Sequence, residues 1–334
     1  MPLFKIEKTP SQKTIHLFGL KIRLKRRFKL SCKERDFLRQ MMTQQELLAN
    51  RHINRCEIES KVENMRHYGL NTTPRNPRVI VTLTSYPARM YDLHFCLYSL
   101  LTQSFKPDKV VLWLGEDKFP EKELDVPKKV LALREFGLEI RWCKDIRSHT
   151  KLLPSLREFP EDILVTVDDD HFYPQNWLQA LWDGYQHSGT ITTTYTKKCI
   201  IKQGKPLHYH HWEHIDIGPE SCGYHNMLYG YGSVLYPPHC LHPDVLDAEK
   251  ALEICPTADD IWFWVHAVRN NSKIYKLPVT QHKIFFVNLE REMGYNNDGT
   301  LHSVNEGIDG ANEVLLQRIY QYYPEFTERL RNET

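Results

Sequence analysis

Three consecutive aspartates, Asp168, Asp169 and Asp170, follow the apolar run Ile163–Val167. An apolar run of this length before a polar break is typical of a buried strand in a parallel sheet. The aspartates then lie at the carboxyl end of that strand, where open α/β sheets bind their ligands. Because adjacent carboxylates repel one another, the segment predicts a site for a divalent cation such as Mg²⁺ or Mn²⁺, which prefers oxygen ligands. The simpler interpretation is an acidic turn in solvent.

A second pair of carboxylates, Asp259 and Asp260, lies in the segment Cys255–Val268. Thr257 can cap a helix there, which places both aspartates in the first turn, where the helix dipole favours negative charge. A carboxylate in that position can accept a proton from a hydroxyl group. A cation that neutralises a departing nucleotide diphosphate, opposite a separate base, is what the transfer of a sugar requires.

The elements that must position these residues alternate between strand and helix. The patterns predict a strand at the start of Val79–Arg89, a helix over Tyr91–Gln103, a strand over Lys109–Gly115, a helix over Pro127–Phe136, a strand over Leu138–Asp145, a helix over Leu152–Phe159 and the strand Ile163–Val167. This alternation predicts an α/β fold with a Rossmann-like, mostly parallel central sheet flanked by helices. The sequence has neither G-x-G-x-x-G nor a Walker-type loop, which argues against a dinucleotide dehydrogenase and a P-loop NTPase.

The chain after Pro174 is less regular. Its patterns predict a helix over Asn176–Tyr185, strands over Thr190–Thr196 and Lys198–Lys202, and a last helix over Glu313–Tyr323. The stretch 287–312 is rich in Asn and Gly, so we expect it to be mobile.

Composition indicates a globular protein, because 41% of the 334 residues are hydrophobic and 26% are charged. The eight cysteines form no Cys-x-x-Cys pair, so we expect reduced thiols and a cytoplasmic location rather than a zinc or disulfide framework. No signal peptide is visible, and no apolar run approaches the length of a membrane-spanning helix.

Positive charge is concentrated near the amino terminus, with nine Lys or Arg and a single acid between Lys13 and Arg35. Alternating apolar and basic residues around Gly19 predict a hairpin over Lys13–Leu30. Such a surface could attract an acidic glycan or the anionic headgroups at the inner membrane face, where each basic residue adds about 1 kcal/mol, or could simply aid solubility. No nucleic-acid recognition motif accompanies it, so we expect no nucleic-acid partner.

The sequence resembles the GT-A glycosyltransferases, and among them the bacterial, family 2-like enzymes of capsule and lipopolysaccharide synthesis. The resemblance spans about Arg78 to Val279. It rests on five stretches in combination, which read VTLTSYPAR, PDKVVLWLGEDKFP, VTVDDDHFYP, GYGSVLYPP and CPTADDIWFW. One departure is that Leu114-Gly115-Glu116-Asp117 stands where the family usually has Asp-Asp-Gly-Ser.

The resemblance implies roles for the two acidic groups. Asp168 and Asp170 match the D-x-D motif that holds Mn²⁺ or Mg²⁺, and Asp169 would lie near the ribose or sugar of the donor. Asp260 matches the general base of inverting members, and Asp259 matches the acid that orients the acceptor. His282 could be a further metal ligand, since some members use a late histidine.

The resemblance also implies the substrate contacts. The residues expected to hold the nucleotide sugar, most plainly a UDP-sugar, are Thr84, Ser85, Tyr86, Arg89, Asp145 and Lys151, together with Asp168 and Asp169. Those expected at the acceptor are Tyr229, Gly230, Tyr231, Gly232 and Trp212, where aromatic rings could stack on sugars.

These expectations divide the chain into three parts. Residues 1–77 would form a basic extension with a hairpin, a helix and a linker. Residues 78–286 would form the catalytic domain, with a nucleotide-sugar half over 78–174 and an acceptor half over 175–286. Residues 287–334 would form a mobile loop and a C-terminal helix. The acceptor would be a bacterial surface glycan, free or lipid-linked.

Three other functions stay open. The cluster His208, His210, His211, His214 and Asp216 could build a metal-dependent hydrolase site, although no HExxH is present. Nucleotidyl transfer uses a similar sheet but usually a Gly-rich basic loop after the first strand, which SYPAR does not match. A noncatalytic glycan-binding protein would use the aromatic residues but would have no need of Asp168, Asp170 and Asp260.

Overall fold

The computed structural model describes residues 4–8, 12–17, 20–25, 53–215, 219–230, 233–278, 284–288, 304–305 and 310–333. The chain divides into two compact units, residues 1–50 and 51–334. The boundary that the sequence suggests after residue 77 therefore falls inside the second unit.

The first unit contains a three-stranded antiparallel sheet in the order β1-β2-β3. Its strands are β1 (Phe4–Lys8), β2 (Gln12–Leu17) and β3 (Leu20–Lys25). The register pairs Ile15 with Ile22 and His16 with Lys21, so apolar and basic pairs alternate along the hairpin. The predicted hairpin is confirmed, and β1 adds a strand that the sequence pattern did not indicate.

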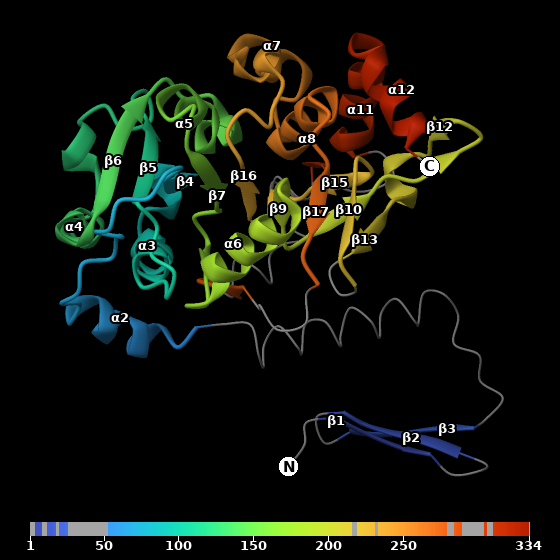
Figure 1. The fold of residues 1–334 in the computed structure, drawn as a ribbon. Coiled ribbons are helices and arrows are strands. Elements are labelled where there is room, and N and C mark those ends of the chain that lie inside the picture. Colours follow the sequence, from blue (N-terminus) through green and yellow to red (C-terminus); the bar gives the residue numbers. More distant parts are fainter. Residues whose placement is uncertain are drawn as a thin grey trace. The chain divides into compact units, whose positions relative to one another are not determined.

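The second unit is built on an eight-stranded sheet in the order β14-β17-β9-β16-β7-β4-β5-β6 (Figure 1). Six strands run the same way, and β16 and β14 run against their neighbours. The sheet is therefore mostly parallel, as expected. Its strands are β4 (Val79–Thr84), β5 (Lys109–Gly115), β6 (Leu138–Cys143), β7 (Ile163–Thr166), β9 (Ile191–Thr193), β14 (Ser221–Gly223), β16 (Val234–Tyr236) and β17 (Ile274–Lys276).

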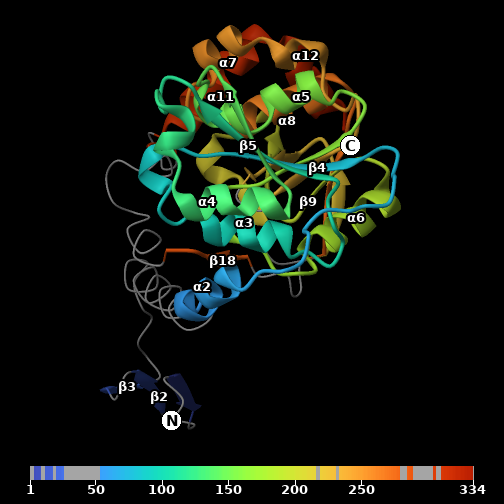
Figure 2. The same cartoon turned by 90° about the vertical axis from the view of Figure 1, so that its left-hand side faces the viewer.

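Helices cover both faces of this sheet, as Figure 2 shows. One face carries α3 (Leu93–Leu101), α4 (Lys128–Ala132) and α6 (Trp177–Ser188). The other carries α5 (Leu153–Glu158), α7 (Ala248–Ile254), α8 (Asp259–Arg269), α11 (Ala311–Tyr322) and α12 (Pro324–Asn332). Successive strand residues point to opposite faces, so in β7 Ile163 and Val165 join the core beneath α3 and α6 whereas Leu164 joins the other core. Burial on both faces explains why the strands read as continuous apolar runs.

Short elements complete the second unit. The 3₁₀ turns are η1 (Pro87–Arg89), η2 (Lys122–Asp125), η3 (Leu133–Phe136), η4 (Arg147–Lys151), η5 (Tyr209–His211) and η7 (Pro243–Leu246). Small sheets join β13-β10-β15, β11-β12 and β18-β8. Their strands are β8 (His171–Phe172), β10 (Thr196–Lys198), β11 (Ile201–Lys202), β12 (Lys205–Pro206), β13 (Glu213–Ile215), β15 (Asn226–Leu228) and β18 (Phe285–Phe286).

Helix α2 (Arg55–Glu63) belongs to the second unit, because Ile53, Ile58 and Val287 are buried together with Phe95 of α3. The sequence had placed this helix in a separate extension and residue 287 at the start of a mobile loop. Most of that loop lies outside the described residues, and so do residues 36–52 of the helix-compatible stretch Asp36–Tyr68, which contains α2. Among the helices that the structure describes, none is both long and apolar enough to cross a bilayer.

The predicted cap of α8 is wrong. The residue before the helix is Ala258, and its first turn receives no side-chain capping bond. The hydroxyl of Thr257 instead donates to Oδ1 of Asn305 at 2.8 Å, and Nδ2 of Asn305 donates to the carbonyl of Thr257 at 2.8 Å. A partner 48 residues away thus takes the hydroxyl that local capping rules assign to the helix.

Candidate active site

The candidate site lies at the carboxyl edge of the sheet. Because β4, β5, β6 and β7 are parallel, the residues that follow them gather at one edge, as ligand-binding residues do in open α/β sheets. The antiparallel β16 begins at the same edge, since Val234 pairs with Thr166 at the end of β7. The loop before β16 is thereby brought beside Asp168.

The middle aspartate is a structural anchor. Asp169 is 6% exposed and accepts hydrogen bonds from the Ser85 hydroxyl and the Arg89 guanidinium. Burial raises its pKa, and the positive charge of Arg89 opposes that rise. The Ser85 hydroxyl is therefore engaged by the protein, and the loop after β4 is bound to the loop after β7.

The two outer aspartates form a candidate metal site with a histidine. Asp168, Asp170 and His171 each offer a ligand atom, and these atoms all lie within 4.8 Å of one another. Nδ1 of His171 is 2.7 Å from Oδ1 of Asp170, and Arg89 lies 2.9 Å from Oδ2 of Asp170. Two carboxylates and an imidazole suit Mn²⁺ well and Mg²⁺ less well. His171 was not among the predicted metal ligands, although its position directly after the three aspartates could have indicated it.

Lys151 joins this site to the second acidic pair. Its ammonium lies 2.9 Å from Oδ1 of Asp168 and 3.2 Å from Oδ2 of Asp259, and the residue is 8% exposed. Burial alone would lower the pKa of Lys151, but the surrounding carboxylates raise it well above its ordinary value. The same ammonium lowers the pKa of Asp259 against the effect of burial. Lys151 is thus cationic and Asp259 anionic.

Asp260 has a different environment from Asp259. Its Oδ2 accepts a hydrogen bond from the backbone N–H of Gly230 at 2.9 Å. Burial and the negative charge of Asp259 raise its pKa from 3.8 to about 7. A carboxylate with a pKa near neutrality can take a proton from a substrate hydroxyl, because general bases act best near the working pH. Asp259 is therefore anionic, whereas Asp260 can accept a proton.

Gly230 is packed against both charged groups. A Cβ atom at this position would lie 2.5 Å from Oδ1 of Asp260 and 3.2 Å from the ammonium of Lys151. The first distance is too short for any side chain, so glycine is required for close packing here. Tyr229 beside it is half-buried against both cores.

The predicted nucleotide residues follow the first strands of the sheet. The hydroxyl of Thr84 donates to the carbonyl of Trp113 at 2.9 Å, whereas the Tyr86 ring is 48% exposed. Asp145 follows β6, accepts from the N–H of Arg147 at 2.9 Å, and packs against Gly115, where a Cβ would lie 2.7 Å from its own. The ring of Tyr86 and the carboxylate of Asp145 therefore lie beside the carboxyl edge of the sheet.

Three predicted residues lie outside the described part of the chain, namely His282, Tyr231 and Gly232. The prediction for Trp212 is wrong. Its ring is 4% exposed, packs edge-on against Trp264, and donates from Nε1 to the carbonyl of Leu207. Trp212 belongs to the core, so its ring is not available to stack on a sugar.

Of the predicted hydrolase cluster, Asp216 lies outside the described residues, and the histidines whose side chains the structure describes do not gather into a metal site. His208 lies 3.7 Å from Glu313, whose carboxylate also accepts from the N–H of Tyr209. His210 and His211 are exposed. These contacts attach the segment to α11 and do not support the hypothesis of a hydrolase site.

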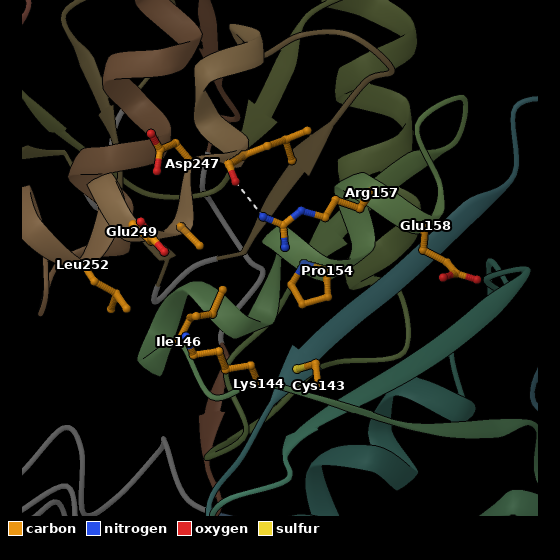
Figure 3. A pocket seen from close by; sticks show the side chains of 11 residues that line it. Cys143, Lys144, Ile146, Pro154, Arg157, Glu158, Asp247, Glu249 and Leu252 are labelled. Carbon is orange, nitrogen blue, oxygen red and sulfur yellow. Dashed lines mark hydrogen bonds between the residues drawn. The ribbon is translucent and has the colours of Figure 1, made fainter.

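A cavity of about 530 Å³ lies between the end of β6, α5 and the start of α7 (Figure 3). Arg157 points across it and donates to the carbonyl of Leu246 at 2.6 Å, and Glu158 pairs with Arg141 at 2.6 Å. None of the predicted site residues lines it. Because Arg157 and Glu158 serve contacts within the protein and no predicted site residue lines the cavity, we do not include it in the site.

No family model matches the chain, and no curated protein does. Solved structures match weakly. TarS from S. aureus in complex with UDP has 13% identity and a TM-score of 0.41, over 73% of this chain and 72% of that one. UDP-glucose pyrophosphorylase from Acinetobacter baumanii has 9% identity and a TM-score of 0.40, over 73% and 100%. Mannosyltransferase PcManGT from Pyrobaculum calidifontis, in complex with GDP-Man and Mn²⁺, has 17% identity and a TM-score of 0.29, over 43% and 41%. At such scores the function must be argued from the site itself.

Proposed function

We propose that the protein is a metal-dependent, inverting glycosyltransferase of the GT-A type. One observation carries the proposal. A cluster able to hold a divalent cation and a carboxylate with a pKa of about 7 lie at the same sheet edge, joined through Lys151. Sugar transfer needs both groups, one for the leaving diphosphate and one for the attacking hydroxyl.

The donor would be a nucleotide-diphosphate sugar, with UDP the expected nucleotide. Asp168, Asp170 and His171 would hold Mn²⁺ or Mg²⁺, which when bound would neutralise the negative charge of the diphosphate. The exposed ring of Tyr86 offers a stacking surface for the base, and Asp145 offers an acceptor for a base N–H. In this proposal residues 78–174 form the donor half of the site and 175–286 the acceptor half.

The chemical step follows from the position of Asp260. Asp260 takes the proton of an acceptor hydroxyl, and the oxygen forms a bond to the anomeric carbon of the donor sugar. The bond from that carbon to the diphosphate oxygen breaks, and the nucleotide diphosphate leaves with the bonding electrons. Inversion results when the base and the diphosphate lie on opposite sides of the sugar.

The first test is calorimetric titration of UDP into the full-length protein with Mn²⁺ and then with EDTA. We expect binding that requires the metal and is lost in Asp170→Ala. Circular dichroism of this variant controls for folding. A folded protein that binds none of UDP, GDP, CDP and dTDP would overturn the proposal.

The acceptor in this proposal is a growing bacterial capsule or lipopolysaccharide glycan, lipid-linked at the cytoplasmic face of the inner membrane. The segment 13–35 supports a contact with anionic lipid, since Lys21, Arg23 and Lys25 occupy alternate positions of β3. We expect binding to vesicles of anionic lipid and not to zwitterionic ones, with about a fivefold loss for each of Lys21→Gln, Arg23→Gln and Lys25→Gln. Equal binding to both kinds of vesicle would contradict this contact.

A further inference from the structure

Three side chains of the short turn η4 reach the segment that leads into α8. Arg147 donates to the carbonyl of Pro256 at 3.3 Å, and Nε2 of His149 lies 2.8 Å from the carbonyl of Cys255. Lys151 lies 3.2 Å from Asp259, the first residue of the helix. The turn therefore holds the amino end of α8 through every second residue, and Lys151 is the member that contacts carboxylates.

The main chain of Lys151 is fixed from the opposite side by buried polar groups. Its carbonyl accepts from the hydroxyl of Thr82 on β4 at 2.7 Å. The same hydroxyl is 2.7 Å from the hydroxyl of Ser155, which accepts from Nε1 of Trp113 on β5 at 2.7 Å. Thr82 and Ser155 are fully buried. Buried polar groups that satisfy one another fix a unique arrangement, so this chain of hydrogen bonds defines where the Lys151 side chain begins.

We propose that Lys151 is a positioning residue that sets the separation between the metal-binding carboxylate and the base. Its carbonyl is bound to Thr82 of β4, which Ser155 links to Trp113 of β5, and its ammonium contacts Asp168 on one side and Asp259 on the other. Asp260 follows Asp259 in the first turn of α8, so a displacement of Asp259 displaces the base. Lys151 acts through these carboxylates and not by direct contact with the sugar. This role differs from the diphosphate contact that the family resemblance implies.

This role rests on the proposed glycosyltransferase function and predicts a specific kinetic pattern. Lys151→Gln should lower kcat by about 10²-fold, because a misplacement of the order of 1 Å has that effect on catalysis. Binding of UDP with Mn²⁺ should change little. Transfer to the acceptor should fall more than hydrolysis of the donor by water, since water does not need an accurately placed base.

A double-mutant cycle with Asp260→Asn separates positioning from general destabilisation. If Lys151 acts through the base, Lys151→Gln should cause no further loss in the Asp260→Asn background. An equal loss in both backgrounds would overturn the proposal. A rise in the Kd of UDP with unchanged kcat would overturn it too, because Lys151 would then bind the diphosphate.

Two further variants guard against loss of folding. Thr82→Val removes the hydroxyl beneath Lys151 while keeping the shape, and should show a weaker form of the same kcat defect, which Thr82→Ser should restore. Arg157→Gln removes an exposed cation of α5 that donates to the carbonyl of Leu246 and contacts no residue of the site, and should leave kcat within about twofold. Full activity of Asp260→Asn alone would instead contradict the proposed function and leave no base for Lys151 to position.

Discussion

The two acidic clusters of the site differ in how their charge is balanced. Around Asp168, Asp169 and Asp170 the protein places the cationic side chains of Lys151 and Arg89. Beside Asp259 and Asp260 the same Lys151 is the only cation within ion-pair distance among the described residues, and Asp260 is held by a backbone N–H.

This difference assigns distinct chemistry to the two clusters. Carboxylates that already contact cationic side chains can exchange one cation for another, which is what binding of a metal requires. Burial and the negative charge of Asp259 raise the pKa of Asp260, so this carboxylate can gain or lose a proton near neutral pH. Charge balance, more than the number of aspartates, distinguishes the proposed cation site from the proposed base.

The sharpest test of this division is Asp260→Asn. Because the amide cannot accept the proton, we expect kcat for transfer to fall by about 10²- to 10⁴-fold. Metal-dependent UDP binding should be unchanged, in contrast to Asp170→Ala. Kinetic and calorimetric measurements on both variants would show whether the two clusters act separately. Loss of UDP binding in Asp260→Asn would contradict a separate role for each cluster.

Gly230→Ala should also act on the base alone. The added Cβ would approach Oδ1 of Asp260 to 2.5 Å, so the carboxylate must move, and we expect a loss in kcat of about 10²-fold. Gly189→Ala is a control for the added methyl group alone, because no atom lies within 4 Å of its Cβ, and its left-handed backbone (φ +66°) makes it a more severe test of folding than position 230. A normal kcat in Gly230→Ala would show that Asp260 tolerates displacement.

The pH dependence should follow the base. Asp260 accepts a proton only when ionised, and its pKa is about 7. We therefore expect kcat/KM to rise with pH up to a midpoint no higher than about 7, since a bound cation lowers the pKa further, and to fall up to tenfold per unit below it. UDP binding measured over the same range provides the control. A rate independent of pH between about 5 and 8 would remove Asp260 from this role.

The smallest expected effect is on stability. In the folded protein the pKa of Asp260 lies at about 7, above its ordinary value of 3.8. The protonated form thus favours folding at low pH, and that contribution is lost as pH rises through about 7. Asn does not ionise, so Asp260→Asn should be more stable than the wild type at pH 8 by on the order of 1 kcal/mol, with little difference at pH 4. Thermal unfolding at both pH values tests this, and a difference that does not change with pH would contradict it.

Sequence patterns predicted the parts of the fold that depend on local order. The strand Lys109–Gly115 has the predicted bounds, and the strand before Asp168 ends one residue early, at Thr166. Apolar runs and helical periods carry this information because each strand or helix buries its own face. The aspartates at the end of β7 and in the first turn of α8 were found for the same reason.

Contacts between distant residues could not be read in this way. Trp212 stands among histidines and polar residues, and its burial depends on Trp264, which lies 52 positions further along the chain. Lys151 was expected to meet a diphosphate, yet its partners are Asp168 and, 108 positions away, Asp259. Thr257 was assigned to a local cap but bonds with Asn305. In each of these cases the folded topology chooses the partner of the side chain.

The reversed strand β16 has a consequence for how this protein could be altered. Its register pairs Val234 with Thr166 and Tyr236 with Leu164, so pairing with β7 holds the strand from Val234 onward. The loop ahead of it is anchored at Gly230 by Asp260 and at Ser233, whose N–H donates to the carbonyl of Gly230 at 3.0 Å and whose carbonyl accepts from the hydroxyl of Thr193 at 2.8 Å. A redesign of acceptor preference should therefore keep Gly230 and Ser233, which join this loop to Asp260 and to the sheet, and vary the positions between them.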